Sequence, residues 1–202
     1  SDSVKTSSPI DVNLTVSGTH GNGDWYISPV TLTFTGDGTV MYRFFNESWL
    51  PWTDGPIVVI QQGNITFQWY WVDWNGTVSP IHTVWLHIDY TPPVVNIIVK
   101  RLCHKLKITV TAYDNISGLG DRIEIWIGPY LQFTATVTNP FGNMSAVWIL
   151  SPIPHHWRQF AHTVRATVDD IAGNEGTGNG TTCLSQCLPA ILLLRNSALD
   201  YR

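Results

Sequence analysis

The chain contains one strand-and-turn motif twice, and this repetition constrains the fold more than any other feature. In the first copy, an alternating run at residues 66–72 leads into Asp73-Trp74-Asn75-Gly76. In the second copy, residues 162–168 lead into the turn at 169–174, about 96 residues further on. Period-two alternation is typical of a β-strand, and Asp, Asn and Gly at its end favour a tight turn. The domain-sized spacing predicts two diverged copies of one β module.

The rest of the chain also reads as strands joined by turns, with no convincing amphipathic helix. The clearest hairpin has Gly36-Asp37-Gly38 between two runs of alternating β-formers. We therefore predict an all-β fold of two tandem antiparallel Ig-like sandwiches. Besides the two motif strands, the expected strands are 30–35, 39–44, 56–61, 83–89, 94–99, 106–113, 122–127, 133–138, 145–150 and 178–182.

The boundary between the modules is expected at Tyr90-Thr91-Pro92-Pro93. Two consecutive prolines fix φ and remove backbone donors, so they end strand pairing and stiffen a linker. The predicted organisation is a flexible N-terminus at 1–9, module 1 at 10–91, module 2 at 92–182 and a C-terminal extension at 183–202.

Several segments resemble the Ig-like repeats, of fibronectin-III or bacterial-Ig type, in prokaryotic surface and secreted proteins, archaeal ones included. The resemblance covers nearly all of residues 10–180 and implies a stalk, an adhesin or an appendage of an enzyme. It does not extend to the tail after Thr181, with its two cysteines and apolar run. The segments that carry it are 25–32, 42–43, 73–76, 88–93, 112–119 and 168–174.

Composition excludes some function classes. The net charge is −4 and no basic run is longer than Lys100-Arg101, so the chain lacks the concentrated positive face that nucleic acid requires. No apolar run approaches the roughly twenty residues of a membrane span, and the run at 188–194 is too short. We expect neither a nucleic-acid partner nor a transmembrane segment in this chain.

Seven Asn-x-Ser/Thr sequons indicate an extracellular or cell-surface glycoprotein. With twelve Asn and about one Ser or Thr in six residues, chance predicts only about two. The alternative is that turn-rich β proteins simply contain much Asn, Ser and Thr. The predicted glycosylation sites are Asn13, Asn46, Asn64, Asn75, Asn115, Asn143 and Asn179.

The three cysteines do not form a zinc signature, because Cys183 and Cys187 lack a second pair of ligands. A hairpin turn after residue 99 and the end of the last strand would lie at the same pole of a sandwich. A disulfide from Cys103 to Cys183 or Cys187 is therefore expected, and a Cys183–Cys187 bond is the competing pairing.

Ten tryptophans are far more than a chain of this length usually carries. Strand alternation puts Trp69 and Trp71 on one face and Tyr70 on the other. Exposed rings can stack on sugars, whereas buried rings would fill the core. The candidates for contact with carbohydrate or another surface protein are Trp49, Trp52, Trp74 and Trp157.

Acidic and amide side chains gather in turns at the expected module ends. Oxygen ligands on such loops can bind Ca²⁺ and stiffen a tandem array, and no other cofactor is expected. Asp and Asn in turns also serve simply to satisfy backbone donors. The candidate ligands are Asp89, Asp114, Asp169, Asp170 and Asn174.

No catalytic motif is present in the sequence, so we expect no enzymatic activity. The leading hypothesis is a non-catalytic module pair that acts as a spacer or adhesion element outside the cell. The alternative is a carbohydrate-binding accessory region of a secreted glycoside-acting enzyme.

Overall fold

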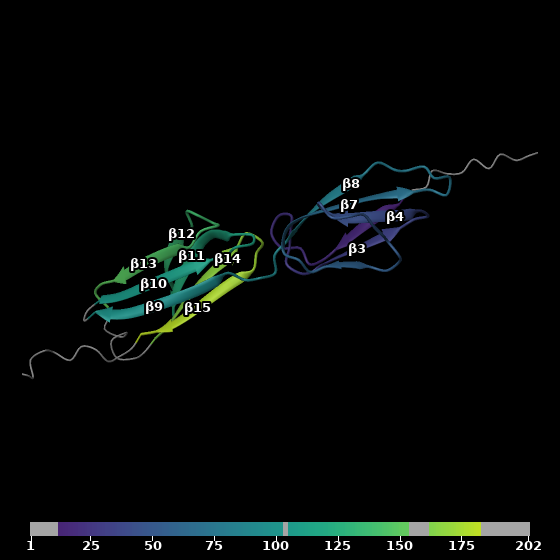
Figure 1. Ribbon diagram of the computed structural model, residues 1–202. Helices are drawn as coiled ribbons and strands as arrows, with labels where there is room; N and C mark the ends of the chain where they lie inside the picture. The colour runs from purple at the N-terminus through teal and green to yellow at the C-terminus, as the bar shows by residue number, and fades with distance from the viewer. Residues whose placement is uncertain (1–11, 103–104, 154–161, 183–202) are drawn as a thin grey trace, which may run out of the picture.

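A computed structural model describes residues 12–102, 105–153 and 162–182. Every regular element in these residues is a β-strand, and the strands form four sheets. The sheets pair into two sandwich-like modules that lie end to end (Figure 1). The predicted fold class is therefore confirmed, although one short pairing, between Trp25–Tyr26 and the strand 82–88, is parallel.

Module 1 packs a three-stranded sheet on a five-stranded sheet. The first has the order β1 (Asn13–Ser17), β3 (Val30–Thr35), β6 (Ile57–Val59). The second has the order β2 (Trp25–Tyr26), β8 (His82–Ile88), β7 (Gly63–Val72), β4 (Thr39–Phe44), β5 (Leu50–Pro51). Alternate residues of β3 and β7 point inward and are buried against one another, so period-two patterning builds this core.

Module 2 repeats the two-sheet plan with its own core. One sheet has the order β13 (Met144–Leu150), β10 (Lys105–Tyr113), β9 (Val94–Leu102). The other has the order β12 (Tyr130–Thr136), β11 (Leu119–Ile127), β14 (Thr163–Asp170), β15 (Glu175–Thr181). The two modules have separate hydrophobic clusters. No strand pairing in the described residues joins one module to the other.

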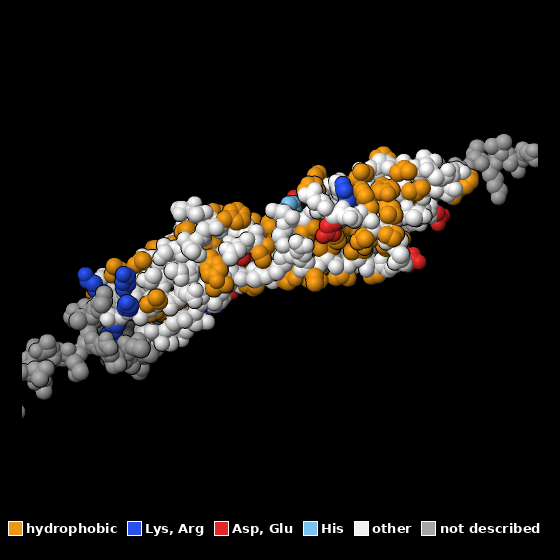
Figure 2. All heavy atoms as spheres, in the orientation of Figure 1, with side chains coloured by type: hydrophobic (Ala, Val, Ile, Leu, Met, Phe, Trp, Pro, Cys, Tyr) orange, Lys and Arg blue, Asp and Glu red, His pale blue; other side chains and the backbone are white. Residues whose placement is uncertain are grey.

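The surface is slim and elongated, with apolar side chains interspersed among polar ones on the face that Figure 2 shows. Lys and Arg side chains gather at the end of module 2 that is far from the junction. Within the described residues, no helix is long and apolar enough to cross a membrane.

Glycines let β15 lie directly on β9, although the two strands belong to different sheets. A Cβ on Gly176 would meet the backbone carbonyl of Pro93, and one on Gly178 would lie 2.8 Å from the carbonyl oxygen of Val95. A Cβ on Gly180 would lie 2.8 Å from the Ile97 side chain. The Gly-x-Gly-x-Gly pattern of β15 thus lets the backbones of β15 and β9 lie close together at this edge of the sandwich.

We expect Gly176→Ala to destabilise the chain by about 1–3 kcal/mol, because the added methyl group meets backbone that cannot move aside cheaply. Thr177→Val is the matched control, since Thr177 is on the same strand and faces solvent. Urea unfolding should show a lower midpoint for Gly176→Ala and a midpoint near wild type for Thr177→Val. Equal midpoints for all three proteins would contradict this account of β15.

Candidate metal centre at the module junction

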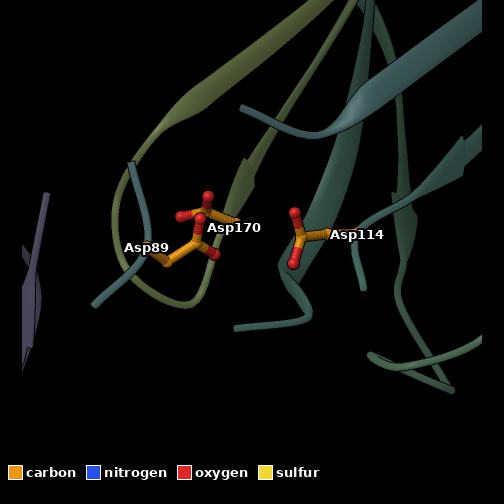
Figure 3. A group of neighbouring side chains, drawn as sticks. All are labelled: Asp89, Asp114 and Asp170. Atoms are coloured by element: carbon orange, nitrogen blue, oxygen red, sulfur yellow. The ribbon is translucent and has the colours of Figure 1, made fainter. Parts of the chain in front are cut away.

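Three aspartates from three separate segments meet where the modules join. Asp89 directly follows β8, Asp114 directly follows β10, and Asp170 is the last residue of β14. Their carboxylates point toward one another (Figure 3). One oxygen from each lies within 4.8 Å of the others, and the residues are only 0%, 4% and 2% exposed. We call this set the junction cluster.

Local turn chemistry explains why aspartates occupy two of these positions. Asp114 Oδ1 accepts hydrogen bonds from the N–H groups of Ile116 (2.9 Å) and Gly118 (2.8 Å). Asp170 Oδ1 accepts from Gly173 N–H (2.6 Å) and Asn174 N–H (2.8 Å). Each side chain therefore closes its own turn with one oxygen. An aspartate can close a turn and still be a cation ligand, because its carboxylate has two oxygens.

Asp89 connects the modules through its side chain and its backbone. Its Oδ2 accepts a hydrogen bond from the Ser117 N–H at 2.9 Å, and its Oδ1 accepts from the Thr91 N–H at 3.0 Å. The Asn174 amide donates to the Asp89 carbonyl (3.0 Å) and to Asp170 Oδ2 (2.7 Å). Asn174 is thus a positioning residue that holds the acidic groups of both modules together.

A second contact lies beside the cluster. The Asn22 N–H donates to the Ala172 carbonyl at 2.8 Å, and a Cβ on Gly21 would collide with that same carbonyl. The Ala172 N–H in turn donates to Ser117 Oγ at 3.3 Å. Ala172 is fully buried between these partners. The turn at 170–174, which is the repeated sequence motif of module 2, therefore docks directly on a loop of module 1.

The junction cluster concentrates acidic groups, and among the described residues no Lys or Arg forms an ion pair with them. The hydrogen bonds that the structure shows to its carboxylates come from backbone N–H groups and from Asn174. Arg122, which lines a hollow with Asp170, pairs with Glu124 instead. Burial raises the pKa of Asp170 above 3.8, and the Asp89 charge adds to this, while hydrogen bonds from Asn174 and Gly173 oppose it.

The geometry suits a divalent cation with oxygen ligands. Oxygens bound to one Ca²⁺ at about 2.4 Å lie at most about 4.8 Å apart, and one oxygen from each aspartate lies within 4.8 Å of the others here. Three carboxylates that are buried so close together also repel one another when ionised. A bound cation would offset this charge and join β8 of module 1 to β10 and β14 of module 2.

The structure separates the predicted calcium ligands into two groups. Asp89, Asp114 and Asp170 form the cluster, and Asn174 contacts it. Asp169 is exposed, because adjacent residues of β14 point to opposite sides. Although Asp169 is exposed, partial desolvation of its carboxyl, followed by the charges of Glu175 and Glu124, raises its pKa. Asp169 lines a surface hollow of about 430 Å³ that also reaches Asp170 of the cluster; the other residues that line it are Asn22, Gly120, Asp121, Arg122 and Ile171.

Sequence reasoning did not find the contributions of Asn22, Ser117 and Ala172. Each acts mainly through a backbone group or through its close packing against a distant loop. No pattern in the sequence marks such contacts, since any residue has a backbone N–H and carbonyl.

The tryptophan candidates have different surroundings. Trp49 packs on the outer face of module 1, with its ring 4.7 Å from Tyr70 and the Arg43 guanidinium 4.5 Å above it. Trp52 packs on the core ring of Phe34 (5.5 Å) and donates Nε1–H to the Gly55 carbonyl. Trp74 is 73% exposed in the turn after β7.

Some predictions lie outside the described residues. These are the contact role of Trp157, the cysteine pairings of Cys103, Cys183 and Cys187, and the terminal segments 1–9 and 183–202. They stay predictions, as do the residue-level boundaries of the modules.

Comparisons with known proteins give only distant structural likenesses. No protein-family model matches the chain, and no curated protein matches it. Fibronectin(III)-like modules of CbhA from Clostridium thermocellum match with 15% identity and a TM-score of 0.33, over 83% of this chain and 92% of that one. The D00-D0 domain of intimin matches with 10% identity and a TM-score of 0.39, over 86% and 100%.

A 1.5-MDa bacterial ice-binding adhesin matches with 16% identity and a TM-score of 0.37, over 88% of this chain and 65% of that one. TM-scores and identities this low do not identify a ligand or a partner for this chain.

The raised pKa of Asp170 predicts a specific pH dependence in the metal-free protein. The folded state binds the Asp170 proton more tightly than the unfolded state, so this group lowers stability as pH rises from 3.8 through its folded pKa. In EDTA, the unfolding free energy of Asp170→Asn minus that of wild type should therefore increase as the pH rises from 4 to 7. Denaturant unfolding across this range measures the difference, and a difference that is flat or falls with pH would contradict the assignment.

Proposed function

We propose that this chain is a non-catalytic pair of Ig-like modules in an extracellular or cell-surface protein, and that it acts as a stiff spacer. The observation that carries the proposal is the junction cluster, where one module contributes Asp89 and the other contributes Asp114 and Asp170. Three buried carboxylates repel one another unless a cation binds, so the link between the modules depends on the ionic surroundings.

The proposed cation is Ca²⁺. It takes 6–8 oxygen ligands in flexible geometry, so three carboxylates and additional oxygens, including water, match its preferences better than those of Mg²⁺. Extracellular calcium sites typically bind in the range of 10⁻⁴–10⁻³ M, which suits a structural ion outside the cell. When Ca²⁺ is bound, the modules would share one set of ligands and bend less at the Pro92-Pro93 linker.

Asp114→Asn tests the calcium site with little damage to the turn. Asp114 uses Oδ1 for both of its hydrogen bonds, and an Asn side chain retains such an oxygen. We expect 10 mM Ca²⁺, roughly 10–100 times such a Kd, to raise the wild-type melting temperature by several degrees over EDTA, since this excess of ligand adds about 1.4–2.7 kcal/mol. Asp114→Asn should lose most of this response, while its melting temperature in EDTA stays at or above wild type.

Asp73→Asn is the matched control. Asp73 Oδ1 accepts from the N–H groups of Asn75 (2.9 Å) and Thr77 (2.7 Å), the same spacing as in the Asp114 turn, but Asp73 lies outside the junction cluster. Its variant should keep the full calcium response. A wild-type melting temperature that ignores Ca²⁺, or an equal response in all three proteins, would overturn the proposed site.

A second candidate function is carbohydrate binding by the outer face of the five-stranded sheet. Trp85 is 68% exposed there, and its strand partner Thr66 alternates with Gln68 and Tyr70 on the same face. Arg43 Nε donates to Gln68 Oε1 at 2.9 Å. With Trp49, this face combines rings for sugar stacking and polar groups that hydrogen-bond hydroxyls.

A soluble polysaccharide should then shift the tryptophan fluorescence of wild type in a saturable way. We expect Trp85→Ala to weaken binding at least several-fold, since it removes a stacking ring. Tyr130→Ala is the control, because Tyr130 is an equally open aromatic ring but lies on β12 of module 2. Affinity electrophoresis provides the second measurement. A flat response across a polysaccharide panel would remove this candidate and leave the spacer.

A further inference from the structure

The seven sequons can be compared on the folded molecule, because all of their asparagines are described. Every one of these asparagines is exposed. They occupy edge strands, turns and the beginning of β7, and they occur in both modules: Asn13, Asn46, Asn64, Asn75, Asn115, Asn143 and Asn179. Exposure of the asparagine therefore does not distinguish one sequon from another.

The hydroxyl residue of the sequon does distinguish them. The requirement for Ser or Thr two positions after Asn means that the transferring enzyme must contact that residue. In six sequons this residue is exposed or half-buried: Thr15, Ser48, Thr66, Thr77, Ser145 and Thr181. In the seventh, Ser117 is only 1% exposed.

Ser117 is held inside the junction by two hydrogen bonds. Its Oγ accepts from the Ala172 N–H at 3.3 Å, and its own N–H donates to Asp89 Oδ2 at 2.9 Å. An enzyme that needs this hydroxyl would have to pull Ser117 away from both partners. Doing so would break one of the two hydrogen bonds that the structure shows between Asp89 and module 2.

Two turns of the same type give a matched comparison. The turns after Asp73 and Asp114 are both closed by an Asp Oδ1 that accepts from the second and fourth following N–H groups. Both turns contain a sequon with an exposed asparagine, Asn75 or Asn115. Thr77 is exposed at a free end of its module, whereas Ser117 faces the neighbouring module.

We propose that the folded chain is an N-glycosylation substrate at six sequons and that the junction shields the seventh, Asn115. The donor class is a lipid-phosphate-linked oligosaccharide. The amide Nδ2 forms a bond to sugar C1 and loses one proton to solvent, while the C1–O bond breaks and the lipid phosphate leaves with the electron pair. This inference rests on the extracellular placement proposed above, but not on calcium binding.

The shielding has a structural consequence. A glycan on Asn115 would stand next to Asp114, beside the junction cluster, whereas no residue of the other six sequons donates a hydrogen bond that the structure shows to this cluster. Modification after folding therefore decorates both modules without displacing Ser117. Modification before folding would reach Asn115 as readily as Asn75, since both sequons are then open.

The test is glycopeptide mapping of the protein from its native source, with the intact mass measured before and after enzymatic or chemical removal of glycans. We expect the mass to fall on glycan removal, glycan-bearing peptides for the six open sequons, and an unmodified Asn115 peptide. In the same host, Asn75→Gln should remove one glycan from the intact mass and Asn115→Gln should remove none.

A peptide of residues 110–120 is the control for the sequence around Asn115. Membranes of the host that contain the lipid-linked donor should glycosylate this peptide, because it lacks the junction that buries Ser117. An intact mass that does not change on glycan removal would overturn the proposal, and so would a glycan on Asn115. Failure of the peptide as an acceptor would show that local sequence, rather than burial, closes the site. The rise of the melting temperature with Ca²⁺ does not depend on any of these outcomes, so the two proposals can fail separately.

Discussion

The burial of three carboxylates at one point is the constraint on which the junction depends. A buried charge is costly unless hydrogen bonds or an opposite charge compensate it. Here the hydrogen bonds come from turn backbone at residues 116, 118, 173 and 174, so the acidic groups fix the shapes of the turns that carry them. These turns then place Ser117 and Ala172 against module 1. Removing the acidic side chains would therefore alter the shape of the junction as well as its charge.

The link between the modules is polar, and this distinguishes it from the modules themselves. Each module has its own hydrophobic cluster and can hold its sheets together without the other. Between them lie directed hydrogen bonds, a Pro-Pro linker and a group of buried carboxylates. Charged groups respond to protons and cations more strongly than hydrophobic contacts do. The junction, rather than either core, is therefore where we expect pH and cations to act.

Side chains that look equivalent in the sequence have different roles in the structure. Asp73 and Asp114 close similar turns, but only Asp114 contributes to the junction cluster. Trp52 packs against Phe34 in module 1, while Trp85, in the middle of a strand, is open to solvent. Trp85 is not among the sequence candidates, because those tryptophans were expected to be exposed in loops and Trp85 lies in a strand. The outer face of a two-layer sandwich has no covering layer, so strand residues on it are exposed as well.

The sequence by itself determined the all-β class, the two modules and most strands, because period-two alternation and turn residues act locally. The strands at 30–35 and 39–44 have the predicted bounds, whereas β1, β2 and β5 were not predicted. Two of these three strands have only two residues, too few to show a period.

The sequence also predicts Asp89, Asp114, Asp170 and Asn174 as candidate ligands, since acidic turns are visible in the chain. Only the tertiary structure decided that these four residues meet and that Asp169 does not join them. That choice depends on the register of β14 and on the way two modules dock, and both are set by contacts between residues far apart in the chain.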